Sequence, residues 1–276
     1  MDFRTVLQTV PDSVWAVYWG LMGAAIGSFL NVVIYRVPRG ESIVFPRSRC
    51  PACTRPIPWY YNIPIVSWLW LRGRCAYCRA LIAVRYLIVE VWTAGTFAGL
   101  FLKWQWTPTF FILAVLVSLC IALFFIDMEW QILPDGLTLT GMAFGLATIG
   151  PNALVDWRSG LFGWAVGIVF PLAIYWGYWL IRRQEGMGFG DVKLMGMLGA
   201  FLGMERLILV VILAAFFGIV VGTIIWRVQR SASFGQVILP FGTMLTAATW
   251  IVIFWGDRLL AMYEMWMMRW YLKWIL

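Results

Sequence analysis

The chain has 276 residues, of which 62% are hydrophobic and 12% are charged. Soluble domains carry roughly 45–50% apolar and about 25% charged residues, so this composition excludes a soluble globule and a disordered chain. Five Cys residues are too few for a disulfide-rich secreted scaffold, and the absence of His excludes catalytic triads and zinc sites that need imidazole. The class that remains is a polytopic membrane protein.

Apolar runs of about 20 residues predict membrane-spanning helices. Eight such segments follow one another along the chain, and the fourth and sixth are short enough to be expected inside a bundle, shielded by longer helices. They cover residues 14–34, 86–103, 109–127, 134–150, 160–181, 191–204, 207–226 and 237–256. The predicted fold is therefore all-α, a polytopic membrane helix bundle of about eight spans.

Positive charge is concentrated in the segment 35–85, which holds nine Arg and a single acid, Glu41, for a net charge of +8. The positive-inside rule places this segment in the cytoplasm and the N-terminus on the opposite side of the membrane. Its arginines are expected to contact anionic lipid. Nucleic acid is not an expected partner, because the segment carries no RNA- or DNA-binding motif. The Trp- and Met-rich tail 257–276 is predicted to form an interfacial helix.

Two C-x2-C pairs lie inside the basic segment, Cys50-Pro-Ala-Cys53 and Cys75-Ala-Tyr-Cys78, separated by 21 residues. Four thiolates at this spacing can close a tetrahedron around Zn²⁺, with every position filled as in structural sites. Two disulfides or four free thiols are the alternatives, although persistent disulfides are unusual in a reducing cytoplasm. The sequence predicts a small cytoplasmic zinc ribbon that gains much of its folding free energy from the metal.

Two aspartates stand at the ends of predicted spans, where ionisable groups are functional candidates. Asp127 ends the third span, and Asp191 begins the sixth, directly after a glycine-rich stretch that includes Gly188 and Gly190. Two carboxylates that share one proton can cleave a peptide bond without His, one activating water and the other polarising the carbonyl. The partial charges of helix ends favour Asp191 as the base and Asp127 as the acid.

Three further features flank this pair. Glycines at 188 and 190 would let the backbone approach a substrate strand closely. Asp135 opens the fourth span, and Glu129 lies between Asp127 and Asp135. Asp135 follows Pro134, so it fits equally well in the first turn of a helix, where it would complement the helix dipole.

The chain resembles the type IV prepilin leader peptidases, bifunctional membrane aspartic proteases of the G-x-G-D type, from about residue 23 to 256. The resemblance is carried by Asp127, the double C-x2-C and the segments Gly27-Ser28-Phe29-Leu30-Asn31-Val32-Val33-Ile34-Tyr35-Arg36, Asn62-Ile63-Pro64, Leu133-Pro134-Asp135, Gly188-Phe189-Gly190-Asp191-Val192-Lys193 and Pro240-Phe241-Gly242. It implies a multi-pass protein of the bacterial inner membrane, with Asp127 and Asp191 as catalytic residues facing the cytoplasm.

The resemblance also implies the substrates and cofactors. A basic leader would be cut from prepilins or pseudopilins after a glycine, and the new N-terminus would then be methylated with S-adenosylmethionine as donor. By position, Gly73 and the zinc cysteines match the region linked to methyl transfer. Because leader and loop are both basic, the leader is expected to be held by an acid such as Glu129 or Asp135, or by anionic lipid.

These expectations divide the chain into four parts. Residues 1–34 form the first span, 35–85 the zinc-binding loop and methyltransferase region, 86–256 the transmembrane peptidase domain, and 257–276 the interfacial helix. Two alternatives remain open from the residues alone. One is a transporter or channel with a zinc-ribbon regulatory domain, and the other is a secretion-system scaffold.

Overall fold

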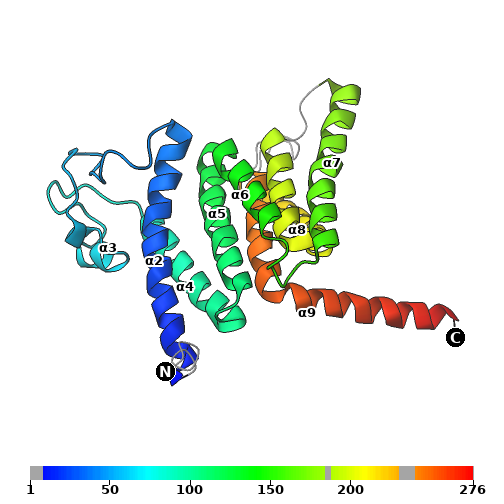
Figure 1. Ribbon diagram of the computed structural model, residues 1–276. Coiled ribbons are helices and arrows are strands. Elements are labelled where there is room, and N and C mark those ends of the chain that lie inside the picture. The colour runs from blue at the N-terminus through cyan, green and yellow to red at the C-terminus, as the bar shows by residue number, and fades with distance from the viewer. Residues whose placement is uncertain (1–8, 184–187, 230–239, 276) are drawn as a thin grey trace. The chain divides into compact units, whose positions relative to one another are not determined.

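The computed structural model describes residues 9–183, 188–229 and 240–275, and these are helical with no β-strand among them (Figure 1). The predicted all-α fold is therefore confirmed. The chain divides into two compact units. The first comprises residues 1–137 with 151–153, and the second comprises residues 138–150 with 154–276.

Three long helices form the first unit: α2 (Asp12–Arg36), α4 (Arg85–Trp104) and α5 (Pro108–Trp130). Helices α2 and α4 approach closely at Gly27, where a Cβ would lie 2.9 Å from the Cα of Glu90. A shared apolar core fills the space between the three helices. Its buried members are Leu30, Val33, Ile34, Val89, Ile121, Ala122, Phe125 and Ile126.

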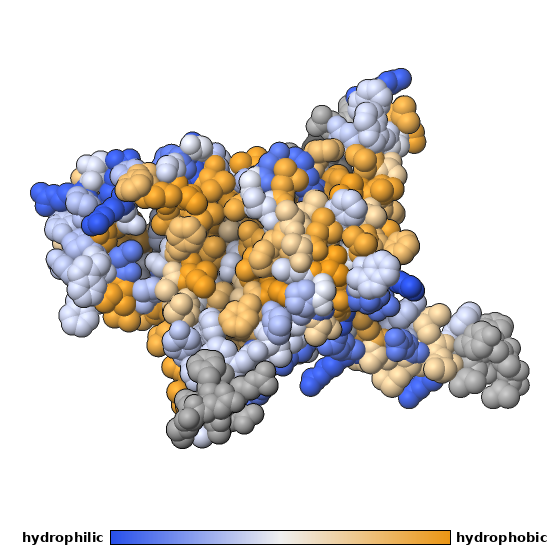
Figure 2. All heavy atoms as spheres, in the orientation of Figure 1, coloured by the Kyte–Doolittle hydropathy of each residue, from blue (hydrophilic) through white to orange (hydrophobic). Residues whose placement is uncertain are grey.

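A long loop joins α2 to α4 and carries three short helical turns, η1 (Val37–Arg39), η2 (Trp59–Tyr61) and α3 (Val66–Trp70). It lies beside α2 (Figure 1) and is largely hydrophilic on the visible face, whereas hydrophobic side chains cover much of the helices (Figure 2). Apolar helix surfaces next to a charged loop are typical of a protein that spans a membrane and carries an aqueous insertion.

The second unit contains most of α6 (Asp135–Ala147), together with α7 (Trp157–Arg182), α8 (Phe189–Gln229) and α9 (Phe241–Ile275). The backbones of α7 and α8 lie in direct contact. A Cβ added to Gly199 would be only 2.1 Å from the carbonyl oxygen of Gly163. Small residues permit such close packing between membrane helices. Helix α9 packs against α8. Its buried residues lie before residue 257, and from there onward its described side chains are mostly exposed.

Within the described residues, six helices are long and apolar enough to cross a membrane: α2, α4, α5, α7, α8 and α9. The predicted number of eight is approximate for two reasons. Helix α6 has only 13 residues. Helix α8 contains both the sixth and the seventh predicted spans, which meet at non-helical backbone around Gly203 (φ 76°, ψ 175°). Residues 237–239 of the last predicted span lie outside the described residues.

Candidate functional site

The four cysteines of the loop converge. The sulfur atoms of Cys50, Cys53, Cys75 and Cys78 all lie within 4.8 Å of one another, and none is in a disulfide. Cys50 Sγ and Cys78 Sγ are 3.8 Å apart. A tetrahedron with metal–sulfur bonds of about 2.3 Å has edges of about 3.8 Å. The cluster therefore has the donor set and spacing of a four-thiolate metal site, and the disulfide alternative does not apply.

Each cysteine pair sits in the same backbone turn. In the first, Cys50 N donates to the carbonyl of Arg55 (3.0 Å), and Thr54 N donates to the carbonyl of Cys50 (2.8 Å). The second repeats these bonds 25 residues later, from Cys75 (2.9 Å) and Arg79 (3.1 Å). Thr54 and Arg79 occupy equivalent places and both have positive φ, 58° and 62°. The sequence shows only the C-x2-C repeat; the shared turn, which extends two residues beyond each pair, becomes visible in the structure.

Backbone amides stabilise a thiolate in the cluster. The amides of Cys78 and Tyr77 donate to Cys75 Sγ and lower the pKa of that thiol to about 6. These amides favour the thiolate form of Cys75, the form that binds metals. The pKa of Cys78 is raised to about 11, because desolvation and the neighbouring thiols outweigh the amide of Ala80.

Gly73 lies just before the second cysteine pair, and the structure gives it a local reason to be glycine. Its φ is +65°, and a Cβ there would lie 2.8 Å from the ring of Trp68. Its carbonyl accepts a hydrogen bond from Ile82 N (2.7 Å). The structure thus places Gly73 between an aromatic ring and the second cysteine pair. Its predicted contact with a cofactor stays a prediction.

The two candidate catalytic aspartates occupy the helix ends that the sequence predicted. Asp127, 5% exposed, lies in the last turn of α5 in the first unit, and Gln131 ends that helix in the left-handed region. Asp191 lies in the first turn of α8 in the second unit. Its amide donates to the carbonyl of Gly188 (3.0 Å). Gly188 lies next to this carboxylate: a Cβ on it would be 3.4 Å from Asp191 Oδ2, in van der Waals contact.

The remaining predicted acids lie on either side of the turn between α5 and α6. Glu129 forms an ion pair with Arg85, which joins the end of α5 to the start of α4. Asp135 is exposed and opens α6, in agreement with a first-turn position. Gly190 lies within the first turn of α8. The sequence does not predict Arg85 as the partner of Glu129, because the two residues are 44 positions apart along the chain.

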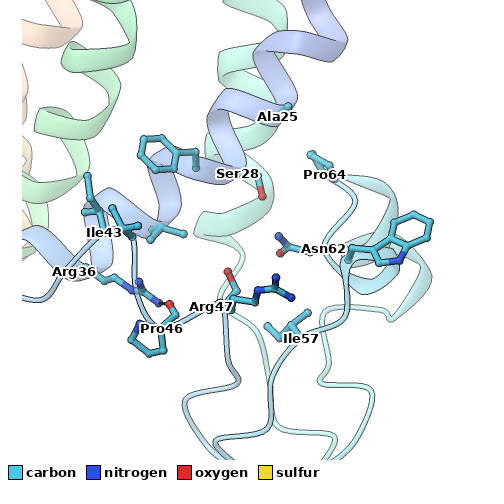
Figure 3. Close-up of a pocket in the computed structure, with 14 residues that line it drawn as sticks. Ala25, Ser28, Arg36, Ile43, Pro46, Arg47, Ile57, Asn62 and Pro64 are labelled. Carbon is cyan, nitrogen blue, oxygen red and sulfur yellow. Dashed lines mark hydrogen bonds between the residues drawn. The ribbon is translucent and has the colours of Figure 1, made fainter.

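An open pocket of about 650 Å³ lies between α2 and the loop (Figure 3). Sequence analysis did not predict it, although several of its residues belong to the motif 27–36. Its lining residues are Ala25, Ser28, Phe29, Val32, Arg36, Ile43, Val44, Pro46, Arg47, Ser48, Ile57, Trp59, Asn62 and Pro64.

A buried acid supports the wall of this pocket. Glu90, 7% exposed in α4, accepts a hydrogen bond from Ile65 N (2.6 Å) and another from the hydroxyl of Ser28. An ionisable side chain inside a predicted span was a signal that could have identified Glu90 from the sequence. Arg36 donates to the carbonyls of Ser42 (2.9 Å) and Pro46 (2.8 Å), and so fixes the opposite wall.

Together the fold and these sites define a polytopic helical membrane protein with a cluster of four cysteines and with aspartates at helix ends. Two family models match the chain: the Bacterial Peptidase A24 N-terminal domain over residues 21–104, and the Type IV leader peptidase family over residues 114–223. No solved structure shows significant similarity to it.

Curated relatives named prepilin leader peptidase/N-methyltransferase cover most of the chain. The protein of Stutzerimonas stutzeri is 34% identical over 268 residues, 88% of this chain and 91% of the relative. That of Aeromonas salmonicida is 35% identical over 297 residues, 93% of each chain. That of Myxococcus xanthus is 44% identical over 209 residues, 75% of this chain but 62% of the longer relative. The chain belongs to the prepilin leader peptidase/N-methyltransferase family.

Proposed function

We propose that this protein removes the basic leader peptides of type IV prepilins or pseudopilins and then methylates the new N-terminal residue. The observation that carries this proposal is the alignment of nearly the whole chain with relatives that have both activities in their names. The matched Type IV leader peptidase model supports the proteolytic half. Neither the transporter nor the scaffold alternative is favoured by these relatives.

For proteolysis we assign Asp127 and Asp191 as the catalytic pair. In this mechanism one carboxylate removes a proton from water as it attacks the carbonyl after the leader's glycine, and the protonated partner donates a hydrogen bond to the carbonyl oxygen. Asp191 is assigned as the base because it lies at a helix N-terminus, and Asp127 as the acid because it lies at a helix C-terminus.

The substrate contacts are assigned to residues around this pair. Gly188 and Gly190 are assigned to the contact with the substrate strand, because a residue without a side chain lets two backbones approach closely. Asp135 is exposed and can attract the basic leader. For Glu129 to do so as well, the leader's cation must compete with Arg85 for the carboxylate.

The cysteine cluster can hold a metal ion, and we assign it to structural zinc, since four thiolates leave no position for a reacting water. The membrane is assigned as the bacterial inner membrane. The N-terminus is placed in the periplasm, and the basic loop and the cleavage site are placed in the cytoplasm, because positive charge concentrates in that loop.

The direct test incubates the purified protein with a prepilin peptide and labelled S-adenosylmethionine, and measures cleavage and methyl incorporation separately. Asp127→Asn and Asp191→Asn are each expected to reduce the cleavage rate by about 10²–10⁴-fold or more, while methylation of an already cleaved peptide persists. Asp156→Asn is the matched control, since Asp156 is exposed at the start of α7 and makes no side-chain cap bond there. Normal cleavage by either Asn variant would refute the assigned pair.

A further inference from the structure

The pocket between α2 and the loop is lined by basic, polar and apolar side chains without an acid. Arg36 and Arg47 belong to the lining, whereas no Asp or Glu does. The volume of about 650 Å³ falls in the range of sites for whole small-molecule ligands, roughly 300–1,000 Å³. The pocket therefore suits a ligand that combines negative charge with an apolar part.

The guanidinium of Arg36 is buried in one wall of the pocket without a counter-charge. Arg36 is 8% exposed, and its side chain donates to the backbone carbonyls of Ser42 (2.9 Å) and Pro46 (2.8 Å). It forms no ion pair with any residue that the structure describes. Buried charges in proteins are normally paired, so an anion from outside the chain is expected beside this cation.

A second cation of the pocket has donors to spare. Figure 3 shows the side chains of Ser28, Arg47 and Asn62 directed toward a common space. Among the described residues, the guanidinium of Arg47 and the side-chain amide of Asn62 have no hydrogen-bond or ion-pair partner. A guanidinium beside an amide N–H matches the oxygen atoms of a phosphate group.

Glu90 lies behind Ser28 and is not part of the lining. Its carboxylate is 7% exposed and accepts hydrogen bonds from Ile65 N (2.6 Å) and from the Ser28 hydroxyl. The carboxylate is thus engaged with the wall of the pocket and pairs with neither arginine of the lining. Even with Glu90 counted, the surroundings of the pocket stay positive.

The apolar part of the lining follows a membrane helix. Helix α2 contributes Ala25, Phe29 and Val32. Ala25 stands eleven residues before Arg36, so the apolar strip extends about 16 Å from the end of the helix into the span. On the loop side, Trp59 is 78% exposed, and Trp is enriched where a membrane meets water. Basic groups beside an apolar strip at the end of a span match the headgroup and acyl chain of a phospholipid.

We propose that this pocket binds one anionic phospholipid, with the phosphate on Arg47 and Asn62 and an acyl chain along the α2 strip. Arg36 supplies positive charge from the other wall. The loop's net charge of +8 attracts anionic lipid diffusely, over its whole surface. The pocket differs from that attraction because it holds the phosphate and the chain together at a single site. The proposal is independent of the proposed function, since neither proteolysis nor methyl transfer enters its argument.

The test is native mass spectrometry of the purified full-length protein, released from non-ionic detergent after titration with phosphatidylglycerol or phosphatidylcholine. The wild type is expected to retain one phosphatidylglycerol with about tenfold higher affinity than phosphatidylcholine. Arg47→Gln should raise Kd for phosphatidylglycerol by about tenfold to a hundredfold, the range for a charged hydrogen bond. Ala25→Trp, which places an indole on the α2 strip, should abolish this binding.

Two control variants separate the pocket from diffuse attraction and from added bulk. Arg55→Gln removes one positive charge from the same loop at an exposed position outside the pocket lining. Leu21→Trp places the same bulk one helical turn away on α2, where Leu21 is 69% exposed. Both controls should bind phosphatidylglycerol with wild-type affinity. Inorganic phosphate, added as a competitor, should leave the lipid in place, because it lacks the apolar part.

The outcomes decide between a lipid site and its alternatives. Equal affinity of the wild type for the two lipids would overturn the proposal without the use of any variant. Equal losses in Arg47→Gln and Arg55→Gln would show that the attraction is diffuse, and would overturn the single site. Displacement of the lipid by inorganic phosphate, with binding retained in Ala25→Trp, would assign the pocket to free phosphate and overturn the lipid.

Discussion

Single glycines show how far local backbone geometry explains this protein. Gly40 and Gly73 lie in the same loop with nearly the same φ, +67° and +65°. A Cβ on Gly40 would meet nothing within 4 Å, whereas one on Gly73 would meet the ring of Trp68 at 2.8 Å. The two positions therefore separate the cost of the backbone conformation from the cost of a clash.

This contrast predicts different effects for two otherwise equal substitutions. Gly40→Ala should cost about 1–2 kcal/mol, the penalty for an L-residue in the left-handed region. Gly73→Ala should cost roughly 1–3 kcal/mol more, because the Trp68 ring must move. The measurement, made in detergent, is the denaturant concentration at which half of the zinc is released. If Gly73→Ala loses methylation but keeps the midpoint of Gly40→Ala, Gly73 has a direct role in the cofactor site.

At the scale of elements, the cysteine-containing loop and the helix bundle are built from different contacts. The loop has no β-strand among its described residues; its backbone hydrogen bonds lie in three short helical turns and in the two cysteine turns. The core of α2, α4 and α5 is built from helix residues alone. Metal binding should therefore order the loop and leave the helix bundle largely independent.

Removal of the metal tests this division. A chelator, or the variant Cys50→Ser, should increase hydrogen exchange throughout residues 42–82 while exchange in α5 stays slow. Cys120→Ser is the matched control, since Cys120 is buried in α5 and far from the cluster in sequence; it should retain one equivalent of zinc. If the loop amides stay protected from hydrogen exchange after chelation, the proposed structural role of the metal is wrong.

Helix α8 provides a second test at this scale. The backbone leaves the helical region at Gly203, and a Cβ there would lie 2.6 Å from Ser159 Oγ and 2.7 Å from Val155 Cγ2. Gly203→Ala should destabilise the protein by about 2–4 kcal/mol, through strain and overpacking. Gly218→Ala in the same helix, where a Cβ meets nothing within 4 Å, should be neutral or stabilising by up to about 1 kcal/mol. The two variants are compared by their thermal unfolding midpoints in the same detergent. Equal midpoints would show that the break in α8 at Gly203 does not require glycine.

At the scale of the whole molecule, the distribution of charge predicts how the chain crosses the membrane. The segment 35–85 carries a net charge of +8, and the connection between α4 and α5 holds no arginine. The positive-inside rule therefore predicts opposite sides for these two connections.

Thiol labelling measures this topology. In spheroplasts, an impermeant maleimide should react with Gln105→Cys, which lies between α4 and α5, without permeabilisation. It should react with Glu41→Cys in the basic loop only after the membrane is permeabilised. The unmodified chain provides the background from its native cysteines. The reverse pattern would invert the proposed orientation and place the loop in the periplasm.

Sequence by itself determined the helices, the cysteine cluster and the helix-end positions of Asp127 and Asp191. It could do so because the length of an apolar run decides whether a helix can cross a bilayer, and because four thiols at this spacing favour one metal geometry. The position of a residue at the end of a span is likewise a local property.

Only the tertiary structure decided the pocket and the residues that build it. The contact of Glu90 with Ile65 joins residues 25 apart, and the ion pair of Glu129 with Arg85 joins residues 44 apart. Apolar periodicity shows that a helix has a buried face but not which partner that face meets. Such contacts depend on how non-adjacent helices and the loop pack, and that packing first becomes visible in three dimensions.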